Sequence, residues 1–366
     1  MCYNTTGCAT GCAPGCAVGH TYLYTGIEPT AKEFPMKRPT MRDVAELAGV
    51  SKTTVSHVIN ETRFVEDGTK QRVMKAITEL GYRPSLVARS LTTKRTETIG
   101  LIVSEISNYF FAEVLRGIED VLMPESYALL VCNTAEVLKR EKHYLDILMR
   151  QRVDGIIAAA TSQRWGVLSE VEVQHIPVVF VDRVFEGLDG PFVGVDNVRG
   201  AYLGTSHLLE CGHRRIGILA GFQRLSTMRE RLSGFRQALE EHSVPLPEEW
   251  VITSSLSIEG GRGAMRQLLS LSDRPTALFV NNNLLSLGAL LAINELGLRC
   301  PEDIALVGFD DHPWAVVSNP PLTVVRQPAQ KLGQVAAEIL LGLIDGEEPP
   351  ASRIALDCEL VLRQSC

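Results

Sequence analysis

Three side chains that can hydrogen-bond to DNA bases lie close together near residue 52. Lys52, Thr53 and His57 fall within a short helix predicted over residues 52–59. A lysine donates to guanine O6 and N7, and a threonine offers both a hydroxyl and a methyl group to base edges. Helices that read a major groove do so with residues near their N-terminus, and His57 lies one turn further on. This pattern favours base recognition by the helix.

A second set of polar residues suits phosphate contacts, which fix the register of a protein on DNA without reading sequence. The alternative for Thr54 and Ser56 is ordinary helix surface. Thr40 is counted among the DNA-contacting residues and can also cap a helix. The whole set is Thr40, Ser51, Thr54, Ser56, Asn60 and Arg63.

These residues need a scaffold of three short helices. Thr40 can cap a first helix, Gly49 ends it, and Ser51 caps the second. A third helical pattern runs over residues 67–80 and ends at Gly81. Three short helices with a tight glycine turn between the first two predict a helix-turn-helix unit over residues 38–82.

Charge is distributed unevenly along the chain. The 366 residues carry a net charge of −7, yet residues 37–95 hold twelve Lys and Arg against six Asp and Glu, a balance of +6. The remaining residues therefore carry −13. A basic N-terminal unit on an acidic body is typical of a nucleic-acid reader with a separate sensing domain.

Residues 98–366 alternate apolar runs of strand length with helical stretches, which predicts parallel sheets in an α/β domain. About 270 residues exceed one doubly wound core, so two sheets are expected. A helix is predicted near residues 332–344 and a strand near 354–362. The expected strands cover residues 99–103, 129–132, 155–160, 178–181, 216–219, 277–280 and 304–309.

Polar or aromatic residues follow five of these strands, where open α/β sheets bind ligands. Asp, Asn and Arg side chains suit a polyhydroxylated ligand, and an aromatic ring can stack on a sugar or a base. For Phe111 and Trp314, core packing is an equal alternative. The predicted ligand-binding residues are Phe110, Phe111, Asp182, Arg183, Thr227, Arg231, Asn282, Asp310 and Trp314.

The first 37 residues have no hydrophobic periodicity, which indicates a disordered leader. Alternatively, the start codon is assigned too early and Met36 is the true start. Cys8, Cys12, Cys16 and His20 recur at intervals of four, but structural zinc ligands usually sit closer, so a metal site is disfavoured. The leader does not read as a secretory signal, and no apolar run is long enough to span a membrane. The expected compartment is the cytoplasm.

The segment over residues 40–60, TMRDVAELAGVSKTTVSHVIN, resembles the DNA-binding headpiece of the LacI/GalR family of transcription regulators. The continuation over residues 82–91, YRPSLVARSL, is similar to the purine and ribose repressor branch. The resemblance extends through GHRRIG at 212–217 and PPLT at 320–323. It covers the chain from residue 38 onward and implies a homodimer, with a tetramer as the alternative, on a palindromic operator with a central CpG step.

The resemblance also implies a hinge helix within a linker over residues 83–97. Leu91 matches a leucine that wedges into the minor groove, while Ser85 and Arg89 match DNA-contacting positions. Without the resemblance, Leu91 could instead be a buried hydrophobic residue that joins two domains. Thr92 stands where the purine repressor has a lysine, which weakens the expected minor-groove specificity.

For the body, the resemblance implies two lobes joined by three crossovers, with a small-molecule effector between them. The expected lobes are residues 98–196 with 327–350, and 197–322 with 351–366. Leu225 and Arg183 depart from the purine repressor, which disfavours a purine effector and favours a sugar or sugar derivative. Because Arg183 adds a cation, a sugar acid or sugar phosphate is included.

Two other classes compete with a ligand-controlled repressor. A solute-binding protein would explain the body but not the helix-turn-helix segment. An enzyme is disfavoured because no Gly-x-Gly-x-x-Gly follows the first strand and no nucleophile–base pair stands out, so no cofactor is indicated.

Overall fold

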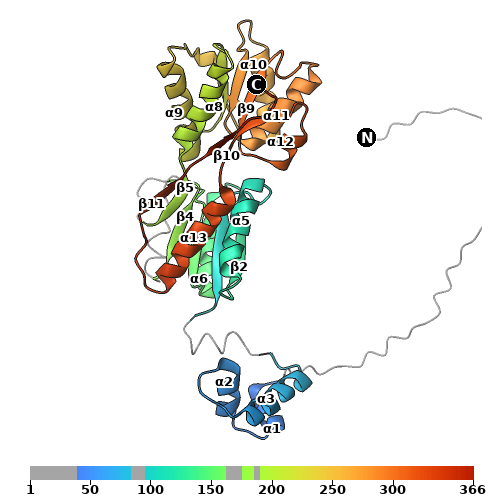
Figure 1. Ribbon diagram of the computed structural model, residues 1–366, viewed down its shortest axis with the longest axis vertical. Helices are drawn as coiled ribbons and strands as arrows, with labels where there is room; N and C mark the ends of the chain where they lie inside the picture. The colour runs from blue at the N-terminus through green and yellow to red at the C-terminus, as the bar shows by residue number, and fades with distance from the viewer. Residues whose placement is uncertain (1–38, 84–94, 162–174, 185–189) are drawn as a thin grey trace, which may run out of the picture. The chain divides into compact units, whose positions relative to one another are not determined.

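The computed structural model describes residues 39–83, 95–161, 175–184 and 190–366. The leader, with its Cys8, Cys12, Cys16 and His20, and the linker residues Ser85, Arg89 and Leu91 lie outside the described residues. The chain divides into two compact units, Met1–Pro84 and Ser85–Cys366. Each unit is described by itself, and their elements are labelled in Figure 1.

The first unit consists of α1 (Met41–Ala48), α2 (Lys52–Asn60) and α3 (Asp67–Leu80). The Asp43 carboxylate accepts from the backbone N and the hydroxyl of Thr40 at 2.7 and 2.8 Å, which fixes the start of α1. Gly49 ends α1 at φ +65°, a left-handed conformation that favours glycine. Fully buried Val44, Val55 and Val73, one from each helix, form the centre of the small core. The predicted helix-turn-helix arrangement is confirmed.

The first lobe of the second unit contains a six-stranded parallel sheet in the order β11-β5-β4-β3-β1-β2. The α5 and α13 helices pack on one face, through the core that holds Ile99 and Leu101, and α6 packs on the other, against Ile102. The elements are β1 (Thr98–Val103), α5 (Tyr109–Leu122), β2 (Ala128–Asn133), α6 (Leu138–Gln151), β3 (Gly155–Ala158), β4 (Val178–Val181), β5 (Phe192–Val195), α13 (Ala329–Ile344) and β11 (Arg353–Leu356).

The second lobe repeats this design with the order β12-β10-β9-β8-β6-β7, in which β12 alone is antiparallel to its neighbour. The α8 and α9 helices cover one face, and α10 and α11 cover the other. The elements are α8 (Asn197–Glu210), β6 (Ile216–Gly221), α9 (Ser226–Glu241), η1 (Glu248–Trp250), β7 (Val251–Ser254), α10 (Ile258–Leu269), β8 (Ala277–Val280), α11 (Asn283–Glu295), β9 (Ala305–Phe309), α12 (Pro313–Val317), β10 (Thr323–Arg326) and β12 (Glu359–Val361).

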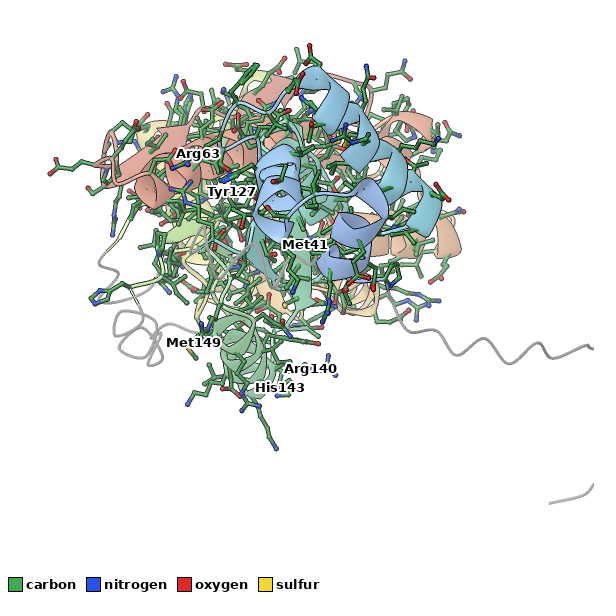
Figure 2. The ribbon with its side chains drawn as sticks, turned by 90° about the horizontal axis from the view of Figure 1, so that it is seen from below. Met41, Arg63, Tyr127, Arg140, His143 and Met149 are labelled. Carbon is green, nitrogen blue, oxygen red and sulfur yellow. The ribbon has the colours of Figure 1, made fainter. Side chains whose placement is uncertain are left out.

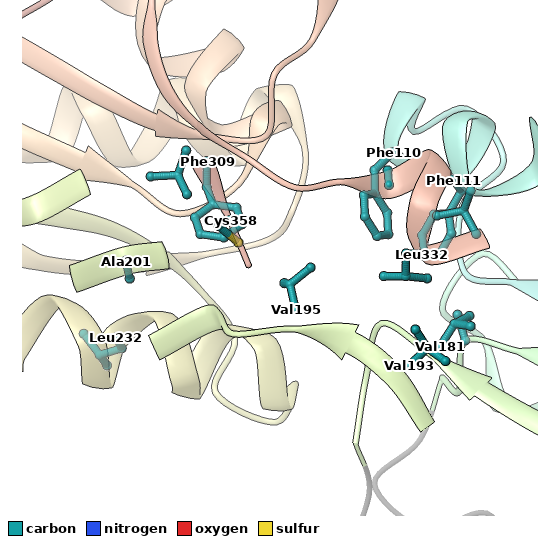
Figure 3. Close-up of a cluster of buried hydrophobic side chains, with 14 of the residues drawn as sticks. Phe110, Phe111, Val181, Val193, Val195, Ala201, Leu232, Phe309, Leu332 and Cys358 are labelled. Atoms are coloured by element: carbon teal, nitrogen blue, oxygen red, sulfur yellow. The ribbon is translucent and has the colours of Figure 1, made fainter. Parts of the chain in front are cut away.

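The chain passes between the lobes three times: after β5, after β10 and after β11. The predicted fold class, a helix-turn-helix unit plus a two-lobed α/β domain with parallel sheets, is thereby confirmed. Buried side chains continue from one lobe to the other, as Val193 and Leu332 of the first and Phe309 and Cys358 of the second show in Figure 3. No helix in the described ranges is long and apolar enough to cross a bilayer.

The lobe boundary near the C-terminus differs from the expected one. The strand predicted near residues 354–362 is two strands, and β11 pairs with β5 in the first lobe while β12 pairs with β10 in the second. Assigning residues 351–366 wholly to the second lobe was therefore wrong. Three short strands, β5, β7 and β10, were not predicted, because their sequences FVGV, VITS and TVVR contain a glycine or polar residues that shorten the apolar run.

The closest helix packing in the first lobe depends on two glycines where α5 crosses α13. A Cβ added to Gly117 would lie 1.9 Å from the carbonyl oxygen of Gln330, and one added to Gly333 would lie 2.0 Å from that of Val114. Both contacts are with backbone, so a side chain at either position would force the helices apart.

We predict that Gly333→Ala lowers the free energy of unfolding by about 1–3 kcal/mol or more, because overpacking against backbone cannot be relieved by rotamer changes. Gly263→Ala on α10 is the control, since its added Cβ would meet nothing within 4 Å. The control should keep or slightly raise stability through helix propensity. Urea denaturation followed by circular dichroism measures both, and equal midpoints would contradict the packing argument.

Candidate functional site

The exposed side of α2 carries the residues predicted to read bases. Lys52 and Thr53 are exposed in its first turn, whereas Val55 and Val58 face the core. His57 is half-buried, and its Nδ1 lies 2.7 Å from the Thr62 hydroxyl, so that bond orients the ring. Sequence reasoning missed Thr62, because its role depends on the turn that follows α2. The side chains of Lys52 and Thr53 are therefore accessible to the major groove of DNA.

Most of the residues predicted to contact phosphates pair with one another along the same helix. The Ser51 hydroxyl accepts from the Thr54 backbone N at 3.0 Å and caps α2, and Asn60 donates to the Ser56 hydroxyl at 3.2 Å. Thr40 belongs to the cap of α1. Arg63 is exposed in the loop after α2 (Figure 2) and forms no ion pair with any described residue.

Phe64, the aromatic residue next to Arg63, was not among the predicted DNA-contacting residues. The Phe64 side chain is 95% exposed beside Arg63. A single exposed hydrophobic residue is common on protein surfaces, so the position of Phe64 next to Arg63 is the reason to consider it. The loop between α2 and α3 therefore belongs to the candidate DNA-binding surface.

The second candidate site is a cavity of about 120 Å³ between the lobes of the α/β unit. Eight of the nine predicted ligand-binding residues line it, because the carboxyl ends of the strands in each sheet meet at one edge. They are Phe110, Phe111, Asp182, Arg183, Thr227, Arg231, Asn282 and Asp310.

The ninth residue, Trp314, does not reach this cavity. Its ring stacks on His312 at 5.7 Å and packs against the core formed by α10, α11 and their sheet. The α12 helix turns it toward that core, so Trp314 is a packing residue, and its expected stacking role at the cavity is not supported. Phe111 lines the cavity and is also only 4% exposed in the core beside Phe110 (Figure 3).

Arg183 is held between two carboxylates. Its Nη1 and Nη2 lie 2.9 and 2.7 Å from the two oxygens of Glu136, and its Nε lies 3.1 Å from Asp182. Burial raises the pKa of the Asp182 carboxyl, while Arg183 and Arg231 oppose that shift. The guanidinium charge of Arg183 is thus balanced inside the protein.

Arg231 lies fully inside the second lobe and is fixed by neutral partners. Its Nε donates to Asn197 Oδ1 at 2.8 Å, its Nη1 donates to the Asn281 carbonyl at 2.7 Å, and its Cζ lies 3.6 Å from the centre of the Phe309 ring. Burial lowers the pKa of this guanidinium, although Asp310 and Asp182 counteract the shift. The two aspartates therefore compensate its charge across the cavity.

Asp310 connects the last strands of the second lobe to the cavity. It accepts from Asn283 Nδ2 at 2.9 Å and from Gln327 Nε2. Asp182 and Asp310 have φ values of +68° and +78°, so each strand ends in a conformation that side chains rarely adopt. Such strain costs on the order of 1–3 kcal/mol per residue and clusters at functional sites.

Two buried acceptors beside Asp310 have no donor among the described residues: Asn283 Oδ1 and Gln327 Oε1. Asn283 also bridges the lobes, because its Nδ2 donates to Asn108 Oδ1 at 3.0 Å. A buried acceptor without a partner costs about 1–3 kcal/mol, which a ligand hydroxyl would recover. Of the two residues, Gln327 lines the cavity, so its Oε1 is the acceptor that a ligand there would reach.

Asn108, Glu136 and Gln327 were missed by sequence reasoning. Glu136 follows β2, so the strand-end argument applied to that strand would have found it. Gln327 follows β10, which was not predicted. Asn108 lies beyond β1 as the cap of α5, where a capping role hid its position at the cavity.

Comparisons with known proteins match both units. Residues 40–85 match the model of bacterial regulatory proteins of the lacI family, and residues 205–366 match a periplasmic binding protein-like domain. The chain is 39% identical over 330 residues to the HTH-type transcriptional repressor PurR of Aliivibrio salmonicida, covering 89% of this chain and 98% of the relative.

Two solved structures extend the comparison. The lac repressor dimer bound to operator and an anti-inducer has a TM-score of 0.82 at 30% identity, over 90% of this chain and 99% of that one. A LacI family transcriptional regulator from Enterococcus faecium with bound ribose has a TM-score of 0.67 at 30% identity, over 73% and 98%.

We predict that Glu136→Gln lowers the free energy of unfolding by about 2–3 kcal/mol, because it leaves the buried Arg183 guanidinium without its bidentate partner. Glu125→Gln, at an exposed position, is the matched control and should change nothing. Chemical denaturation reports both values. Wild-type stability for Glu136→Gln would show that Arg183 is satisfied without this carboxylate.

Proposed function

The chain belongs to the lacI family of bacterial regulatory proteins, and from this premise we propose that it is a transcriptional repressor that binds an operator as a homodimer. A small-molecule effector would control its affinity for DNA. The observation that carries the proposal is the joint presence of an exposed α2 and a polar cavity between two lobes. We place the protein in the cytoplasm and assign it no enzymatic activity or cofactor.

On the DNA side, we assign base reading to Lys52, Thr53 and His57. Ser51, Thr54, Ser56, Asn60 and Arg63 are assigned to phosphates, with Thr40 at the cap of α1, and Phe64 extends this surface. In the linker we propose that Leu91 is a minor-groove wedge, supported by Ser85 and Arg89. Two headpieces on one dimer raise each other's effective concentration, so a palindromic operator is expected. The resemblance to the family implies a CpG step at its centre.

On the effector side, the charges around the cavity favour a neutral polyhydroxylated ligand, most simply a sugar. Four acids, Glu105, Glu136, Asp182 and Asp310, face two arginines. Arg183 is committed to Glu136 and Asp182, so it does not attract an anion as the sequence suggested. This revises the inclusion of sugar acids and sugar phosphates. A purine remains the second candidate, since residues 82–91 resemble the purine and ribose repressor branch.

The two sites would communicate through the lobes. Asn283 of the second lobe donates to Asn108 of the first, and Gln327 lies on one of the three connections between them. A ligand that engages these groups changes the free energy of lobe closure. By linkage, effector and operator alter each other's affinity by the same factor, a coupling of about 1–3 kcal/mol in typical systems.

We predict that Lys52→Ala weakens binding to the operator by roughly 5–150-fold, the equivalent of about 1–3 kcal/mol of base discrimination. Lys75→Ala, at an exposed position of α3, is the matched charge control. Fluorescence anisotropy with operator and scrambled duplexes at one salt concentration separates specific from general binding. Equal losses on both duplexes would reassign Lys52 to a phosphate contact.

The effector is sought first by a thermal-shift panel of neutral pentoses and hexoses, sugar acids, sugar phosphates and purines, since ligands of the native state raise its melting temperature. We predict that a neutral sugar raises it and that Gln327→Leu abolishes the shift, because the unpaired Oε1 is lost. Gln237→Leu on the exposed side of α9 should respond as wild type. A response only to sugar phosphates would overturn the charge argument.

A further inference from the structure

The last residues of the chain are fixed between two strands of the second lobe. Ser365 is fully buried; its hydroxyl accepts from the Thr323 backbone N at 2.8 Å and donates to the Leu306 carbonyl at 2.6 Å. Its own carbonyl accepts from the Leu306 backbone N at 2.8 Å. The position of Cys366, the next residue, is thereby determined by the sheet.

These contacts place Cys366 beside the C-terminal end of α8. Its Sγ lies 2.9 Å from that of Cys211, and the Cys211 Sγ lies 3.6 Å from His207 Nε2. His207 and Cys211 are four residues apart, so they share one side of the helix. Among the residues that the structure describes, this is the one group of three potential metal ligands with donor atoms all within 4.8 Å of one another.

The histidine is oriented as a metal ligand would be. Its Nε2 faces the sulfurs, whereas its Nδ1 lies 4.0 Å from the Glu210 carboxylate. In metal sites the second ring nitrogen usually donates to a carboxylate or carbonyl, which fixes the ring and raises its basicity. At 4.0 Å the Glu210 carboxylate is beyond hydrogen-bond distance, so it would have to move closer to take that role.

We propose that His207, Cys211 and Cys366 form a Zn²⁺ site in which a water completes the tetrahedron. One imidazole and two thiolates are ligands that Zn²⁺ prefers, with Zn–S distances of about 2.3 Å. In a tetrahedron two such sulfurs stand about 3.8 Å apart. A change of the Cys366 side-chain rotamer accommodates this separation. The nearby Cys300 contacts the Ser365 carbonyl at 3.5 Å and lies outside the group.

The competing chemistry for two adjacent thiols is a disulfide. A disulfide between Cys211 and Cys366 would need an oxidant and would give no role to His207 or to the carboxylate behind it. Zn²⁺ binding would involve both thiols, the His207 imidazole and the Glu210 carboxylate, which is why we favour it. Since a histidine and two cysteines also select zinc over the hard cations Mg²⁺ and Ca²⁺, zinc itself is the appropriate probe.

The site lies at the opposite edge of the sheet from the effector cavity. Leu306 and Thr323 stand near the starts of β9 and β10, whereas Asp310 and Gln327 follow the ends of the same strands. Zinc would therefore join the chain terminus to α8 and stabilise the second lobe without touching the effector. Removing zinc should lower the melting temperature and leave effector binding intact.

The test uses the full, untagged chain carrying C2S, C8S, C12S and C16S, so that leader cysteines do not contribute. In this background we expect about one tightly bound Zn²⁺ per chain by elemental analysis and indicator competition, and a melting temperature that rises with added zinc. H207A and C211S should each lose the bound zinc. C132A, which removes a buried thiol of the first lobe, is the control and should retain it.

Replacing zinc with Co²⁺ gives a second readout, the visible absorption of a tetrahedral thiolate site, which H207A should change even if folding is unaffected. Circular dichroism checks that each variant folds, and H207Q replaces H207A if it does not. The proposal fails if no zinc binds, or if H207A and C211S hold as much as the control. It also fails if peptide mapping finds a Cys211–Cys366 disulfide that forms equally in the presence of zinc.

Discussion

Parallel strand pairing is the constraint on which the α/β unit depends. In each lobe the strands run the same way, apart from β12, so their carboxyl ends collect at one edge. That edge is where both sheets present polar residues, and Asp182 and Asp310 leave it with positive φ values. The strain of these turns directs side chains into the cavity rather than along the strand. Residues more than a hundred positions apart thus meet at one site.

Charge compensation then decides what this cavity can bind. Arg183 is balanced by Glu136 and Asp182, and Arg231 lies against the Phe309 ring between amide and carbonyl oxygens. Neither arginine presents an uncompensated charge, while the buried Gln327 Oε1 at the cavity still needs a donor. A ligand rich in hydroxyl groups would satisfy that acceptor without introducing a further charge into the protein interior.

Close helix packing holds the edges of the cavity in place. The α5 and α13 helices meet at Gly117 and Gly333, and α8 meets α9 at Gly234, where an added Cβ would lie 2.0 Å from the Val198 carbonyl oxygen. The α10 and α11 helices approach in the same way at Gly288. Each pair therefore packs closely on its sheet, backbone against backbone at these glycines.

Local sequence patterns were enough to predict the helices of the first unit, most strands of the second, and the residues whose roles are local. Caps, glycine stops and hydrophobic spacing located all three helices of the first unit, and the strand-end argument found eight residues that share the cavity. Tertiary structure decided the rest: the separation of β11 from β12, the turn of Trp314 into a core, the pairing of Arg183 with Glu136, and the approach of Cys366 to Cys211. The difference arises from the separation along the chain between the residues that interact. A cap or a helical stripe is encoded within a few residues, whereas a strand partner, an ion pair or a thiol contact depends on segments that only the folded chain brings together.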